Sequence, residues 1–140
     1  FIYIMNKANN ISKTHILKIF KIQLKQFIAE VIEWFPKEEN IKSLNTIILT
    51  FCRYNPLKLI EIWNYYIAIP YVEMINKGDF NYFENKNYSN DLKDLKGNAG
   101  YVLQCYNKMK NSISKLENDK KLVAIKYTQI LTNLSTIYFQ

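Results

Sequence analysis

The chain has 140 residues, a formal net charge of +7, and 49% hydrophobic against 22% charged residues. This composition predicts one globular domain with its own core and excludes an intrinsically disordered chain. A single histidine and two isolated cysteines exclude a disulfide framework and a metal site built from several His or Cys. We expect Cys52 and Cys105 to be buried thiols in a reducing compartment. No apolar run reaches about 18 residues, so we expect no transmembrane span.

The first helix is predicted over residues 12–35, after an extended or flexible arm formed by residues 1–12. Apolar side chains recur there at steps of three and four residues, which is the pattern of an amphipathic helix. Pro36 ends this helix, because the residue before a proline is displaced from helical geometry. The expected core stripe consists of Leu17, Phe20, Leu24, Phe27, Ile28, Val31, Trp34 and Phe35.

Two further helices are predicted between this first helix and Gly78. The glutamates at 38–39 suit the first turn of the second helix, and the Tyr-Asn-Pro sequence at 54–56 ends it and starts the third. Pro70 removes a backbone donor inside the third helix and should kink it, and Gly78 should stop it. The expected buried residues are Ile41, Leu44, Ile48, Phe51 and Cys52 in the second helix, and Leu59, Ile60, Trp63, Ile67 and Met74 in the third.

Residues 76–91, NKGDFNYFENKNYSND, interrupt the helical pattern with aromatic residues set among polar ones. We favour a packed joint in which Asp79 binds nearby backbone amides and Phe80 and a buried Phe83 plug the bundle. Ser89 then begins the next segment. The alternative is a platform that stacks on the bases of single-stranded nucleic acid. The platform would use Phe80, Tyr82, Phe83 and Tyr88 together with Lys77 and Lys86.

A fourth and a fifth helix are predicted after the Gly-Asn-Ala-Gly break at 97–100, joined by a tight connection into an αα-hairpin. The fourth should bury Ala99, Val102, Tyr106, Met109, Ile113 and Leu116, and the fifth Val123, Tyr127, Ile130, Leu134 and Ile137. No second alternating run offers a partner for a strand. We therefore expect an all-α protein whose single domain, residues 13–140, is a bundle of about five helices.

The positive charge is concentrated at the N-terminal end, where residues 1–29 hold five lysines and no acid. A localised basic surface indicates nucleic acid, acidic protein or anionic lipid as a partner, although a solvated helix face has the same pattern. One Arg against eighteen Lys disfavours base readout, so any contact with nucleic acid would be nonspecific and salt-sensitive. The candidate surface consists of Lys13, Lys18, Lys21 and Lys25, with Ile19 and Ile22 beside the core stripe.

Catalytic patterns are weak throughout the chain. His15 has no Ser or Cys in a recognisable nucleophile context, and we expect it to be an exposed residue at the start of the first helix. The acid pairs Glu30 with Glu33 and Glu38 with Glu39 lie where solvated helix faces and first turns place acids. No phosphate loop precedes a helix. We therefore assign no catalytic residue, no metal ligand and no cofactor.

Four segments nevertheless form a recognisable order: QLKQFIAEVIEWFP (23–36), NPLKLIEIW (55–63), IPYVEMINKGDFNYFENKNYSND (69–91) and YTQILTNLSTIY (127–138). Over residues 17–138 the chain resembles small helical proteins of the giant, nucleocytoplasmic large DNA viruses. The motif residues are Gly78, Asp79, Tyr82, Phe83, Tyr88 and Ser89, with Tyr82 standing where the family usually has Phe. The resemblance implies a viral origin, an all-α fold, and a location in the virion or the infected-host cytoplasm.

These observations lead to two functional hypotheses. The first is a non-enzymatic viral structural or interaction protein, a virion component or small scaffold that binds other viral proteins through helical surfaces. The second is a basic packaging protein that binds the phosphate backbone of nucleic acid nonspecifically through the N-terminal lysines.

Overall fold

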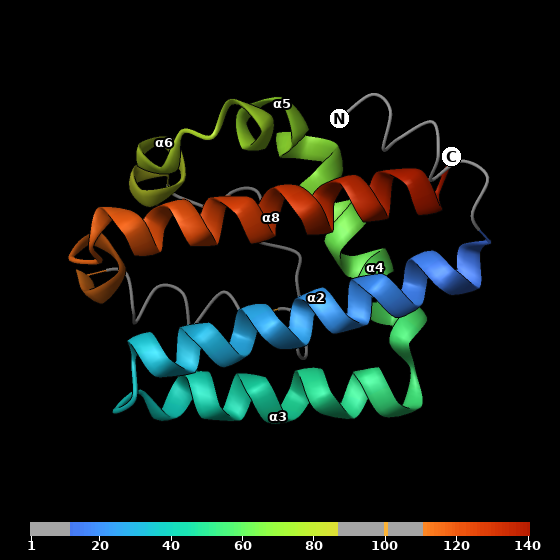
Figure 1. Cartoon of the computed structure of the whole chain (residues 1–140), viewed down its shortest axis with the longest axis horizontal. Coiled ribbons are helices and arrows are strands. Elements are labelled where there is room, and N and C mark those ends of the chain that lie inside the picture. The colour runs from blue at the N-terminus through green and yellow to red at the C-terminus, as the bar shows by residue number, and fades with distance from the viewer. Residues whose placement is uncertain (1–11, 87–99, 101–110) are drawn as a thin grey trace.

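The structure is a computed structural model that describes residues 12–86, residue 100 and residues 111–140. Across these ranges the elements are helical and contain no strand, which confirms the predicted all-α bundle for this part of the chain (Figure 1). The elements are α2 (Lys13–Trp34), α3 (Glu39–Tyr54), α4 (Pro56–Trp63), the π-helix η1 (Asn64–Ala68), α5 (Ile69–Lys77), α6 (Phe80–Asn85) and α8 (Asn118–Tyr138).

Helix α2 begins and ends where the sequence predicts. The Ser12 side chain is the N-cap and accepts a hydrogen bond from the His15 backbone N–H at 3.2 Å, while the His15 side chain itself is exposed. At the other end, the Phe35 N–H donates to the Val31 carbonyl at 3.1 Å, directly before Pro36. Between these two ends the helix buries an apolar residue every four positions from residue 16 to residue 28, which forms one apolar face.

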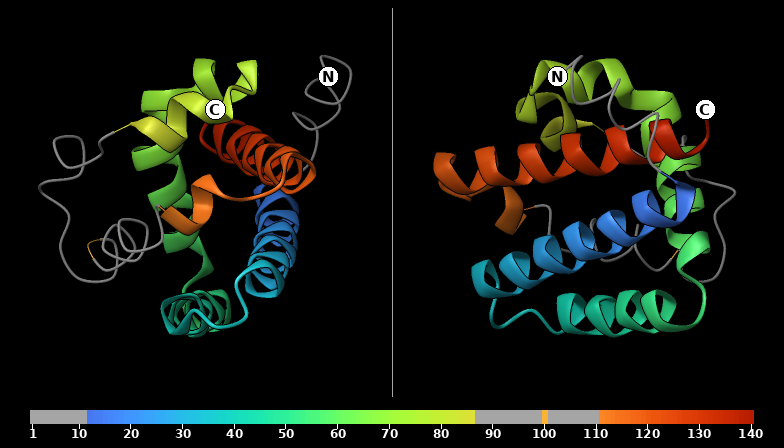
Figure 2. Two further views of the ribbon diagram at one scale, coloured as in Figure 1. Left: turned by 90° about the vertical axis from the view of Figure 1, so that its left-hand side faces the viewer. Right: turned by 45° about the vertical axis from the view of Figure 1, so that its right-hand side comes forward.

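This apolar face places α2 between α3 on one side and α8 on the other (Figure 1). Figure 2 shows α4 packed across the α2–α8 pair. Phe20 and Leu24 of α2 form one cluster with Ile60 of α4 and Leu131 of α8. The Trp63 ring meets Phe20 edge-on with the centroids 6.2 Å apart. The centre of the core is thus built from residues far apart in the chain.

The predicted third helix is divided into α4, η1 and α5. Pro70 is the second residue of α5 and has no backbone N–H. The preceding turn therefore lacks one hydrogen-bond donor for its carbonyl groups, and the π-helix η1 occupies that turn. Ile60 is fully buried as expected, and α5 also buries Tyr71 and Ile75, which the sequence analysis did not select. Gly78 ends α5 in the left-handed conformation, with φ of 71°.

One predicted core residue of the last helix is wrong: Ile130 is 42% exposed. The buried face of α8 instead contains Leu131, Thr132 and Ser135, all fully buried. The hydroxyls of Thr132 and Ser135 form hydrogen bonds inside the core, so small polar residues face inward here. A search for apolar residues alone therefore selected Ile130, which lies outside the buried stripe.

Several predictions fall on residues outside the described ranges. These include Tyr88, Ser89, Cys105 and most of the predicted fourth helix. Ile113, from that predicted helix, packs against the cluster of Ile28 and Ile41. Within the ranges that are described, no helix has the length and hydrophobicity needed to cross a membrane.

Candidate functional site

The N-terminal lysines of α2 have different surroundings. Lys18 and Lys25 are exposed and Lys21 is half-buried on one flank of α2, but the Lys13 ammonium lies 5.3 Å from the ring centroid of Tyr138 at the end of α8. Of the two isoleucines assigned to this surface, Ile22 is 44% exposed whereas Ile19 is half-buried.

Lys21 and Lys25 lie near the C-terminal turn of α3, where Cys52 is buried. Burial raises the pKa of the Cys52 thiol, and the positive charges of Lys25 and Lys21 oppose that rise without cancelling it. Among the described residues, no carboxylate lies within ion-pair distance of Lys18, Lys21 or Lys25. Within the described part of the chain, this flank of α2 therefore carries three lysines that pair with no acid.

The acid pair Glu30 and Glu33 does not converge on a shared site. Glu33 is exposed, whereas Glu30 is half-buried beside Tyr127 of α8, whose ring stacks on Phe27 with the centroids 5.0 Å apart. Burial raises the pKa of the Tyr127 phenol, and the nearby charge of Glu30 raises it further. This contact lies inside the α2–α8 interface and has a structural explanation.

The joint at residues 76–86 has the predicted cap but a more open aromatic cluster. The Asp79 carboxylate accepts a hydrogen bond from the Tyr82 N–H at 3.3 Å and caps α6. Phe83 was expected to be buried but is half-buried, and its ring meets Tyr71 edge-on with centroids 6.0 Å apart. The physical reason is that α6 is a single short helix, none of whose residues is enclosed on all sides.

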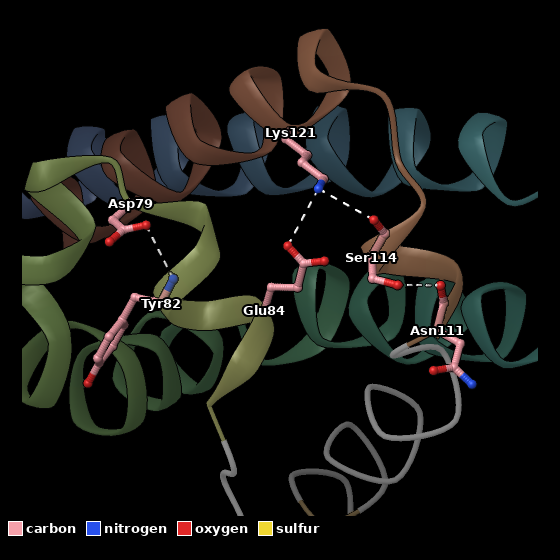
Figure 3. A network of polar contacts seen from close by, with 6 residues as sticks. All are labelled: Asp79, Tyr82, Glu84, Asn111, Ser114 and Lys121. Atoms are coloured by element: carbon pink, nitrogen blue, oxygen red, sulfur yellow. Dashed lines mark hydrogen bonds and ion pairs between the residues drawn. The ribbon is translucent and has the colours of Figure 1, made fainter.

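Phe80 lies under a cation instead of plugging the bundle alone: the Lys121 ammonium is 5.3 Å from its ring centroid. Lys121 also forms an ion pair with Glu84 at 3.4 Å and donates to the Ser114 carbonyl at 3.4 Å (Figure 3). The Lys121 and Glu84 side chains are 17% and 13% exposed. This network ties α6 to the start of α8, and nothing in the sequence pairs residues that are 37 positions apart.

The structure reveals a site that the sequence analysis did not assemble. A pocket of about 600 Å³ lies where η1, α5 and α6 meet. Tyr71 and five further described residues form its aromatic and apolar wall, and Lys86 also lines it. The five are Tyr65, Tyr66, Ile69, Pro70 and Tyr82.

Two features of this pocket, which we call the tyrosine pocket, make it a candidate binding site. Tyr65 and Ile69, four residues apart, are each 66% exposed although both are large. The Lys86 ammonium lies 5.4 Å from the ring centroid of Tyr71 and 5.7 Å from that of Tyr82. The pocket therefore combines accessible aromatic faces with a cation held over two rings.

Sequence reasoning placed Tyr82 and Lys86 in a possible stacking platform but missed the tyrosines of η1 and α5. Those residues occur about fifteen positions earlier, inside a predicted helix, where aromatic residues are read as core. The Tyr65–Tyr66 pair shortly before Pro70 was the available signal, because π-helices often occur at functional sites.

No protein-family model, curated protein or solved structure matches this chain. Among the described residues, no group of three or more His, Cys, Asp or Glu side chains is arranged to hold a metal ion. Function must therefore be argued from the surfaces and pocket of this chain.

Proposed function

We propose that this chain is a non-enzymatic interaction protein of a large DNA virus, acting in the virion or infected-host cytoplasm as a virion component or small scaffold. Its partners would be other viral proteins, bound through exposed helical surfaces. The viral part of the proposal is supported by the order of motifs between residues 17 and 138, and the interaction part by one structural observation.

That observation is the outer face of α8. Leu122 is 58% exposed and Ile130 is 42% exposed, with the exposed Lys126 midway between them. Residues four apart on a helix lie on the same side, so these three form one stripe along α8. Apolar side chains at this spacing are the anchors by which a helix enters the groove of a partner.

The test compares two double variants in infected cells. Replacing Leu122 and Ile130 by Gln should remove cross-links between this chain and other viral proteins while leaving the fold intact. Replacing Leu49 and Leu57, which are exposed on α3 and α4, by Gln should leave those cross-links unchanged. Cross-linking mass spectrometry and sedimentation velocity supply the readouts. A strictly monomeric chain with no viral neighbour would contradict the proposal.

A second candidate function is nonspecific binding of nucleic acid by the α2 flank. It is favoured by the charge of Lys18, Lys21 and Lys25, which no carboxylate pairs with among the residues that the structure describes. Each phosphate contact contributes about 0.9 to the slope of log affinity against log salt. Replacing these three lysines by Gln should therefore flatten the slope for duplex DNA by about 2 to 3.

The matched control for this second candidate replaces Lys58, Lys115 and Lys126, three exposed lysines outside α2, by Gln. It removes the same net charge and should change the slope much less. DNA affinity that is absent at low salt, or does not change with salt, would exclude this function.

The finer architecture belongs to the same proposal: about five helices in all, a kink at Pro70, and a C-terminal αα-hairpin. The π-helix directly before α5 supports the kink, because it lies in the turn disturbed by proline. The contact of Ile113 with the α2–α3 cluster supports a helix leading into α8.

A further inference from the structure

We propose that the partner of the α8 stripe is an acidic protein groove, in which an Asp or Glu side chain meets Lys126 between two apolar pockets. The α8 stripe is the exposed row of Leu122, Lys126 and Ile130. This inference rests on the interaction function proposed above, and it states the chemistry of the protein surface that the stripe binds.

The stripe consists of two apolar anchors with one positive charge between them. Leu122 and Ile130 are separated by about 12 Å along the helix axis, and Lys126 stands midway. Side chains at this spacing project from the same side of a helix. A groove that takes both anchors must therefore also face the Lys126 ammonium.

The charge of Lys126 is not neutralised from within α8. The side chains three and four positions away along the helix are all uncharged: Leu122, Val123, Gln129 and Ile130. The acidic residue of α8, Asp119, lies about 10 Å from Lys126 along the axis, which is roughly the distance over which salt screens exposed charges.

The rest of the described chain supplies no counter-ion either. Among the residues that the structure describes, no carboxylate lies within ion-pair distance of Lys126. A partner that covered both anchors would also remove this ammonium from water, which is costly unless the partner provides an opposite charge. An acidic side chain between the two apolar pockets meets that requirement.

A second copy of the chain is a poor partner for the same stripe. An antiparallel pair that joined both anchors would place Leu122 of one copy against Ile130 of the other. Lys126 would then face its own copy across the two-fold axis, and a parallel pair in register would bring the same two ammonium groups together. Like charges across an interface disfavour association, and the net charge of +7 adds repulsion at longer range.

A zero-length carbodiimide reagent tests the proposed pair directly, because it joins an amine to a carboxylate only where the two groups are in contact. Applied to infected cells that express the intact chain, it should link Lys126 to an Asp or Glu of another viral protein, as mass spectrometry can read. Lys58, an exposed lysine of α4, is the internal comparison and should give no such link. No link from Lys126, or a link to a second copy of this chain, would overturn the proposal.

Charge reversal tests the same contact by a second route. Lys126→Glu should lower the amount of the linked protein that co-purifies with the chain by about tenfold or more, because it places two acids together. Lys126→Arg keeps the charge and should stay within about twofold of the wild type. Lys58→Glu is the matched control, since it makes the same charge change at an exposed site outside the stripe. Circular dichroism checks that each variant is folded.

The double variant Leu122→Gln with Ile130→Gln separates this inference from the function on which it rests. If the double variant loses the viral neighbours while Lys126→Glu keeps them, the interaction function stands and the acidic groove is wrong. If neither variant loses a neighbour, the interaction function itself is wrong. Neighbours that disappear after nuclease treatment would mean that nucleic acid joins the proteins, which would also overturn the acidic groove.

Discussion

In the α2–α8 interface Phe20, Leu131, Thr132 and Ser135 are fully buried, whereas α6, which lies beside the start of α8, has no buried residue. The interface is stabilised by removing large apolar side chains from water. The α6 end is stabilised by a few specific polar contacts: the Asp79 cap, the bond from Gln129 to the Ile75 carbonyl at 3.0 Å, and the Lys121–Glu84 pair.

The comparison indicates that the interface contributes most of the stability, whereas the accessible tyrosine rings lie at the α5–α6 end. In the interface the Phe20 ring is fully enclosed, so it offers no face to a ligand. The α5–α6 end leaves tyrosine rings partly exposed because polar contacts, which need less enclosure, hold it in place. Regions of low local stability are also those from which binding sites are usually drawn.

The largest effect is expected at the centre of the interface. Phe20→Ala removes a fully buried ring that contacts Trp63 and should lower the free energy of unfolding by about 3–5 kcal/mol. Ile22→Ala, two residues away on the exposed side, should change it by less than about 1 kcal/mol. Urea denaturation measures both, and similar losses would show that α2 is not oriented as described.

At the α6 end, Lys121→Met keeps the aliphatic stem but removes the cation from Glu84, Ser114 and the Phe80 ring. The Glu84 carboxylate then stays mostly buried without its ammonium partner, which should lower the free energy of unfolding by about 2 kcal/mol. Limited proteolysis should show cleavage near α6 before cleavage of α2. Lys126→Met, on the exposed face of α8, is the control. Unchanged protease resistance would contradict the role given to this pair.

A smaller effect is expected for a hydrogen bond that joins two side chains across the core. The Trp63 indole N–H donates to the Thr132 hydroxyl at 3.0 Å. Thr132→Val keeps the shape and leaves the indole without an acceptor, which should lower the free energy of unfolding by about 1–2 kcal/mol. Thr136→Val, which removes only a bond to the Thr132 carbonyl, should have a weaker effect in the same urea experiment.

The smallest effect is expected at Gly78. A Cβ there would meet Gln129 and Ile125 at 3.7 Å, which is an ordinary contact distance. Gly78→Ala should therefore lower the free energy of unfolding by only about 1 kcal/mol, because alanine adopts the left-handed conformation less readily than glycine. Gly78→Asn should lose less, because Asn tolerates this conformation better. Thermal unfolding measures both variants. A much larger loss of stability in both would mean that glycine is needed because a side chain does not fit there, and not because of the backbone conformation.

The sequence predicted the interface better than the α6 end, for physical reasons. The stripe through Phe20, Leu24 and Ile28 repeats at helical spacing, so burial follows from periodicity. The cap at Asp79 was also predicted, because capping is local chemistry. In α8 the same method selected Ile130 wrongly, since Thr132 and Ser135 supply part of the buried face through their hydroxyl bonds.

The candidate site was less predictable because its parts are distant in the chain. Tyr82 and Lys86 were recognised within one short segment, but their partners Tyr65 and Tyr71 belong to η1 and α5. No local sequence pattern predicts that α6 packs beside η1 and α5. The pairing of Lys121 with Glu84 likewise depends on tertiary packing alone.

Hydrogen–deuterium exchange of the unliganded chain tests the contrast between the two regions most directly. Amides of α2 and α8 around Phe20 and Leu131 should exchange only as fast as global unfolding allows, because opening them breaks the main core cluster. Amides of α6 should exchange faster, through local opening that needs only the loss of its polar contacts. Equal protection of α6 and the α2–α8 interface would contradict the account.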